Sequence, residues 1–172
     1  MSKNTQANKS KDRLDFALQM EENNLSELLK QTQESSDALL PAMNVFLTFQ
    51  QQFLQTLKDA TLTEVDAIAF PSITSNIIPD EAEWQMVIAT YAKTIQDPAQ
   101  QFLRLWLVNS IFEKTAAFYR QVSISSASPA VRLFASSSAE LKKIMARRVE
   151  SVLRVCINKS WEKLGFCPFP LN

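Results

Sequence analysis

The clearest alternation of apolar and polar positions lies in the last third of the chain and predicts one long amphipathic helix over 129–165. Apolar side chains recur there at helical spacing: Leu141, Met145, Val149, Val152 and Cys156. Ser128 suits an N-cap and Pro129 the first helical position, while Gly165, the only glycine, stands where a C-cap glycine belongs. A serine cluster at 136–138 favours helix weakly and leaves the continuity of this helix open.

Two further helices are predicted in the first part of the chain. Over 12–35, leucines form an apolar stripe among acidic and amide side chains. Over 41–60, Phe46, Phe49 and Phe53 form an aromatic stripe at helical spacing. Such a stripe is most often bundle core, and the alternative is an adhesive face for an apolar surface or a partner helix.

The middle of the chain holds two more helices with clear boundaries. Asp80 and Glu83 form a capping-box variant at the start of a helix over 80–96. Asp97 and Pro98 then supply the N-cap and first residue of the next helix. This helix, over 98–122, is apolar around much of its circumference, which is typical of a central helix.

Residues 61–79 interrupt the helical pattern with threonine, isoleucine and two prolines. The segment is apolar, so we expect a packed crossover with a short helix near 64–70. Its isoleucines Ile73, Ile77 and Ile78 would mark a binding patch if they were exposed.

These elements predict an all-α fold, an antiparallel bundle of four to five amphipathic helices with an apolar crossover at 61–79. The 172 residues suit one domain, and a single glycine is too few for the tight turns of most sheet folds. We expect a disordered tail over 1–11, the bundle domain over 12–165 and an irregular C-terminal tail over 166–172, which either docks on the bundle or stays mobile.

Charge is divided unevenly although the formal net charge is zero. Residues 12–97 hold 14 acidic and 4 basic side chains, whereas residues 98–172 hold 4 acidic and 11 basic ones. The polar side of the last helix is basic: Lys142, Lys143, Arg147, Arg154 and Lys163. We interpret this side as facing the acidic first helices, or as contacting an anionic or amphiphilic surface. Nucleic-acid binding is not expected, because no recognition motif is present.

The residue types needed for most catalytic chemistry are missing from this sequence. It has no histidine, which removes the Ser-His-Asp, Cys-His and di-iron Glu-x-x-His arrangements. One glycine excludes a P-loop, and two distant cysteines make a zinc site improbable. We therefore expect no enzyme activity, no cofactor and no metal. A polar N-terminus and the lack of a long apolar run predict a cytoplasmic protein without a transmembrane segment.

The helix start Asp97-Pro98-Ala99-Gln100-Gln101-Phe102-Leu103 and the later Ser137-Ser138-Ala139-Glu140-Leu141 with its regular Arg/Val pattern resemble the C-terminal half of phasins. Phasins are small helical proteins that coat polyhydroxyalkanoate granules. The resemblance covers about residues 90–163 and implies a granule-associated coat.

Taken together, these patterns predict a non-enzymatic helical interaction protein that binds an apolar or amphiphilic surface, alone or as a homo-oligomer. The alternative is a helical adaptor or regulatory subunit that binds another protein. The apolar contact residues would be Phe46, Phe49, Phe53, Ile73, Ile77 and Ile78, and the polar ones Lys143, Arg147 and Arg154.

Overall fold

The computed structural model describes residues 3–62, 68–69 and 78–165 and shows an all-α bundle. Its helices are α1 (Lys3–Gln33), α2 (Leu40–Lys58), α3 (Glu81–Thr94), α4 (Pro98–Ser125) and α5 (Pro129–Lys163). Two strands of two residues each, β1 (Thr61–Leu62) and β2 (Ile68–Ala69), pair in antiparallel orientation.

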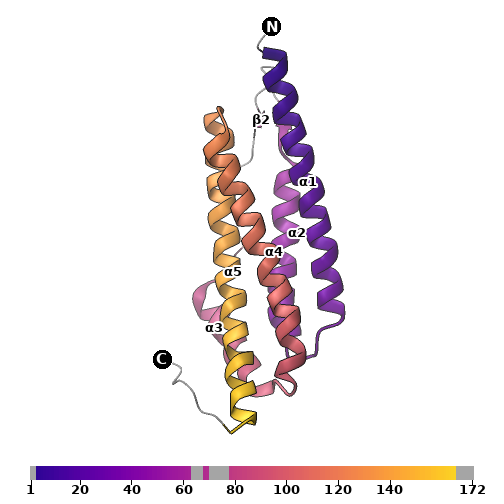
Figure 1. Ribbon diagram of the computed structural model, residues 1–172, viewed down its shortest axis with the longest axis vertical. Coiled ribbons are helices and arrows are strands. Elements are labelled where there is room, and N and C mark those ends of the chain that lie inside the picture. The colour runs from indigo at the N-terminus through magenta and orange to yellow at the C-terminus, as the bar shows by residue number, and fades with distance from the viewer. Residues whose placement is uncertain (1–2, 63–67, 70–77, 166–172) are drawn as a thin grey trace.

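Four long helices form the bundle as two hairpins (Figure 1). A short connection joins α1 to α2, and another joins α4 to α5, whose backbones approach each other closely along their length. The end of α2 and the whole of α3 lie at opposite ends of the molecule, and α3 lies beside α5 (Figure 1). Neighbouring long helices are antiparallel, as the sequence predicted.

The aromatic stripe of α2 forms the centre of the core, as expected for its commoner interpretation. Phe46, Phe49 and Phe53 are all fully buried. Phe112 of α4 lies with its ring centroid 6.0 Å from that of Phe46 and 5.9 Å from that of Phe49. Trp84 joins α3 to this core, at 5.6 Å between its ring centroid and that of Phe46. The rings therefore connect both hairpins and the short helix.

The helix boundaries follow the predicted caps. Asp80 accepts a hydrogen bond from the Glu83 backbone N–H at 2.8 Å, and Ser128 accepts one from the Val131 N–H at 3.4 Å. Gly165 has φ +77°, the left-handed conformation that a C-cap requires and glycine adopts readily. The serine cluster does not break α5, because Ser138 donates its hydroxyl to the Phe134 carbonyl within the helix, at 2.8 Å.

The described residues differ from the expected local structure at two places. The expected disordered tail is helical from Lys3, because residues 3–11 contain no proline or glycine and include good helix formers such as alanine, glutamine and lysine. Most of the short helix expected near 64–70 lies outside the described residues. Of that span only Ile68 and Ala69 are described, and they pair with Thr61–Leu62 as strands. β-branched residues favour that extended conformation. The C-terminal tail, 166–172, lies outside the described residues.

Candidate functional site

The core contains a buried polar network that joins three helices. Lys142 of α5 donates from Nζ to Glu21 Oε2 of α1 and to Gln50 Oε1 of α2, both at 2.8 Å. Gln50 Nε2 in turn donates to Glu21 Oε2 at 2.7 Å and to the Glu21 backbone carbonyl at 3.0 Å. All three side chains are fully buried. We call Glu21, Gln50 and Lys142 the buried triad.

Aromatic rings surround the ammonium group of the buried triad. Lys142 Nζ lies 4.1 Å from the ring centroid of Phe53, 5.4 Å from that of Phe49 and 5.8 Å from that of Phe112. These distances are typical of cation–π interactions, and such interactions partly compensate for the hydration that the buried charge has lost. Burial lowers the pKa of Lys142, and the Glu21 carboxylate opposes that shift.

Tyr119 lies beside the triad. It is almost completely buried, and its hydroxyl lies close enough to the Glu21 carboxylate for the two groups to interact, although neither the hydroxyl nor Glu21 Oε1 makes a hydrogen bond of ordinary geometry within the described part of the chain. Burial raises the pKa of Tyr119 well above its ordinary value, and the nearby Glu21 carboxylate raises it further.

The triad fits a structural role better than a catalytic one. A buried lysine beside a carboxylate could serve acid–base chemistry, but all three side chains have zero exposure, so no substrate reaches them in this arrangement. A hydrogen-bonded charged network instead fixes which helices pack together and in what register. Its members come from both hairpins, so it ties α1 and α2 to α5.

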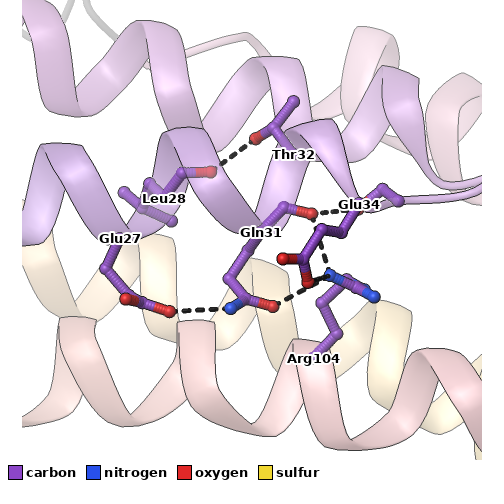
Figure 2. A network of polar contacts seen from close by, with 7 residues as sticks. Glu27, Leu28, Gln31, Thr32, Glu34 and Arg104 are labelled. Atoms are coloured by element: carbon purple, nitrogen blue, oxygen red, sulfur yellow. Dashed lines mark hydrogen bonds and ion pairs between the residues drawn. The ribbon is translucent and has the colours of Figure 1, made fainter.

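A second polar network connects α1 to α4 nearer the surface (Figure 2). Arg104 donates from Nη1 to Gln31 Oε1 at 3.1 Å and forms an ion pair with Glu34 at 3.0 Å. Gln31 donates to Glu27 at 2.7 Å. The ion pair joins a basic residue of the second half to an acidic residue of the first, in line with the uneven charge of the sequence.

Large exposed apolar side chains occur both in the first turns of α4 and in the last turns of α5. These two helix ends lie together, because Lys163 donates to the Gln96 carbonyl just before α4 (Figure 1). The exposed side chains are Phe102, Leu103, Trp106, Ile157, Trp161 and Leu164. Leu103 is 71% and Trp106 56% exposed. We call this group the α4–α5 apolar end.

A basic stripe on α5 leads towards this apolar end. Arg147, Arg154 and Trp161 recur at intervals of seven residues, so they share one helical face. Lys143 lies on the same face and is half-buried, whereas Arg147 and Arg154 are exposed. Glu150 is the acidic member of this face. We call Lys143, Arg147 and Arg154 the basic stripe.

The predicted contact residues are therefore separated in the structure. Phe46, Phe49 and Phe53 are in the core and cannot contact an external surface unless the bundle opens. Ile78 is half-buried against the core, and Ile73 and Ile77 lie outside the described residues. The three basic residues keep some or all of their exposure.

Sequence reasoning placed Lys142 on the polar side of α5, which the structure corrects. Ser138, Lys142, Met145, Val149, Val152 and Cys156 repeat at alternating spacings of four and three, and all are buried. This heptad-like spacing is a signal that Lys142 is buried. The signal was overlooked because a charged side chain is usually exposed. The exposed Leu103 and Trp106 were missed because α4 is apolar on several sides, so its pattern does not say which side faces solvent.

Comparison with known proteins finds no match among protein-family models, characterised proteins or solved structures. The resemblance to phasins accordingly stays a prediction. Over the described residues, no helix has both the length and the apolar character needed to span a membrane. In that same part of the chain, no three His, Cys, Asp or Glu side chains cluster in a way that could hold a metal ion.

Proposed function

We propose that this protein is a non-enzymatic interaction protein that binds an anionic, amphiphilic surface through the α4–α5 apolar end. The observation that carries the proposal is the exposure of Leu103 and Trp106 in consecutive turns of α4, beside the apolar last turns of α5. Apolar groups gathered at one exposed end favour contact with an apolar phase, since burying one such side chain gains about 1.5–3 kcal/mol.

The basic stripe supports the anionic character of that surface. Arg147 and Arg154 lie on the face of α5 that continues into Trp161, so apolar insertion and contact with anionic head groups can occur together. A polyhydroxyalkanoate granule, as the phasin resemblance implies, is one candidate surface for the apolar contacts, and a lipid vesicle with anionic head groups is another.

Flotation with lipid vesicles tests the proposal. Wild-type protein should float with vesicles that contain phosphatidylglycerol, and less with vesicles of phosphatidylcholine alone. A Leu103→Ser/Trp106→Ser variant should bind at least tenfold more weakly, because it removes two apolar contacts and about 1.4 kcal/mol already corresponds to tenfold. An Arg147→Gln/Arg154→Gln variant should lose the preference for anionic lipid.

The matched control is Ile124→Ser/Leu133→Ser, which removes two equally exposed apolar side chains at the opposite end of the α4–α5 hairpin. This variant should float like wild type. Equal binding by the Leu103→Ser/Trp106→Ser variant would overturn the assignment of the apolar end. If the wild-type protein binds neither vesicles nor triolein droplets, the adaptor alternative is favoured. That alternative is then tested by capturing a protein partner and measuring the mass of the complex by light scattering after size exclusion.

A further inference from the structure

A small cavity lies at the other end of the bundle, between all four long helices. Its volume is about 40 Å3. Its walls are mainly apolar and come from α1, α2, α4 and α5: Ala17, Leu57, Phe118, Val122, Phe134 and Ala135. Because this end holds the α4–α5 connection, the cavity is remote from the α4–α5 apolar end (Figure 1).

The size of the cavity limits what it can hold. One water-sized group needs about 10–15 Å3, so the cavity has room for roughly three groups of that size. A benzene ring occupies an engineered cavity of about 150 Å3 and would not fit. An alkyl chain end is therefore favoured over an aromatic group.

Charge around the cavity sets the direction in which such a chain would enter. Arg13 lines the cavity and is exposed, so its guanidinium lies on the solvent side. The inner wall includes Tyr119, whose hydroxyl is buried and uncharged because burial raises its pKa. An anionic head group would therefore remain at the rim, where it keeps part of its hydration and meets the opposite charge of Arg13.

The rim also offers apolar contact for the part of a chain that remains outside. Phe16 of α1 is 58% exposed, and its ring centroid lies 5.4 Å from that of Phe118, which lines the cavity. This pair extends the apolar wall from the cavity to the surface between α1 and α4.

We propose that the cavity binds the chain end of a soluble, linear, anionic amphiphile, with its carboxylate at Arg13 and its chain against Phe118 and Ala135. This inference does not depend on surface binding, because it concerns single molecules and a different end of the bundle. Each methylene group that enters should strengthen binding about three- to fourfold.

Calorimetric titration of the full chain with sodium octanoate, below its micelle concentration, tests the inference. Octanoate should bind more tightly than hexanoate, whose shorter chain makes less contact with the Phe16–Phe118 pair at the rim, and more tightly than 1-octanol or octylammonium, which have the same chain without the negative charge. Benzoate should not compete. A wild-type protein that does not bind octanoate at millimolar concentration, or that binds octylammonium more tightly, would overturn the proposal.

Two variants locate the site. Arg13→Gln should weaken octanoate binding at least fivefold and abolish its advantage over 1-octanol, while Lys114→Gln, which removes an exposed charge elsewhere on α4, should leave both unchanged.

Ala135→Leu should block binding by filling the cavity, and Ala89→Leu on the exposed side of α3 is its control. If Ala135→Leu does not fold, the Arg13→Gln result and the ligand series still decide. Unchanged octanoate binding by Arg13→Gln would place the ligand elsewhere and contradict the inference.

Discussion

Lys142 shows how strongly the core depends on a complete polar network. Its ammonium group is 0% exposed and is satisfied by Glu21 and Gln50 at 2.8 Å. Removing one partner of a buried ion pair leaves the other charge without compensation, which costs about 3–5 kcal/mol. Removing both charges and filling the space with apolar groups avoids that cost. The stabilising element is thus the pairing and not the presence of charge.

We predict that Lys142→Met lowers the free energy of unfolding by about 3–5 kcal/mol, because Glu21 is left buried and unpaired. Adding Glu21→Leu should recover most or all of that loss. Urea unfolding followed by circular dichroism measures both values. Additive losses in the double variant would contradict a coupled pair.

Both tyrosines of the chain, Tyr91 and Tyr119, are buried with a raised pKa. Burial is the main cause for each, and contact with Cys156 adds to it for Tyr91, whose hydroxyl lies 2.9 Å from the thiol sulfur. In the unfolded chain a tyrosine loses its proton near pH 10, whereas the folded protein retains both. Stability therefore falls as pH rises past 10.

We predict that, above about pH 10.5, the free energy of unfolding falls by about 1.4 kcal/mol per pH unit for each tyrosine. Lys142 does not add to this slope there, because the unfolded lysine also loses its proton near 10.5. Buried Cys156, whose pKa is also raised, adds to the slope, and Tyr119→Phe should remove only the share of Tyr119. Urea unfolding at pH 10.5 and 11.5 tests this, and an unchanged slope in the variant would contradict it.

At the scale of elements, local side-chain signals determine where helices begin and end. Asp80, Ser128 and Gly165 each occupy the cap position that the sequence predicted. Asp97 is different, because it precedes Pro98 at a helix start but makes no capping hydrogen bond through its side chain. The two aspartates therefore form a matched pair for measuring what a cap contributes.

We predict that Asp80→Ala lowers the free energy of unfolding by about 1 kcal/mol, because the Glu83 N–H loses its acceptor. Hydrogen exchange in α3 should speed up as the first turn frays. Asp97→Ala should change stability by less than half as much. Equal losses in the two variants would show that the Asp80 side-chain bond is not the cause.

The elements that were not predictable from sequence depend on contacts distant in the chain or on the absence of an apolar stripe. The first residues of α1, from Lys3, show no apolar periodicity, so helical propensity is the only signal in the sequence that predicts a helix there. The pairing of Thr61–Leu62 with Ile68–Ala69 involves only two residues on each side, too few for a period-two pattern.

At the scale of the whole molecule, sequence periodicity predicted the bundle but not its surface. Each amphipathic stripe indicates which residues are buried, and Phe46, Phe49 and Phe53 are indeed buried in the core. Which apolar residues remain outside depends on how many neighbours each helix has. α4 has an excess of apolar residues, so Leu103 and Trp106 stay exposed although nothing in their spacing distinguishes them.

The whole molecule also separates the proposed binding activities in space. The α4–α5 apolar end lies at one end of the bundle and the cavity beside Arg13 at the other, and along α5 Lys142 of the buried triad stands between Ala135 of the cavity and Ile157 of the apolar end. We expect surface binding and octanoate binding to be independent, so saturating octanoate should not change flotation with vesicles. A change of tenfold or more would indicate that the two sites are coupled through the core.

Depth-dependent quenching of Trp106 tests the proposed surface binding most directly. In a Trp161→Phe variant the remaining tryptophans are Trp106, which is exposed, and Trp84, which is buried and donates a hydrogen bond from its indole N–H to Ser151. Anionic vesicles with brominated acyl chains should quench the Trp106 emission and shift it to shorter wavelength, while Trp84 stays unquenched. Protein that floats with these vesicles while Trp106 remains unquenched would contradict binding through the α4–α5 apolar end.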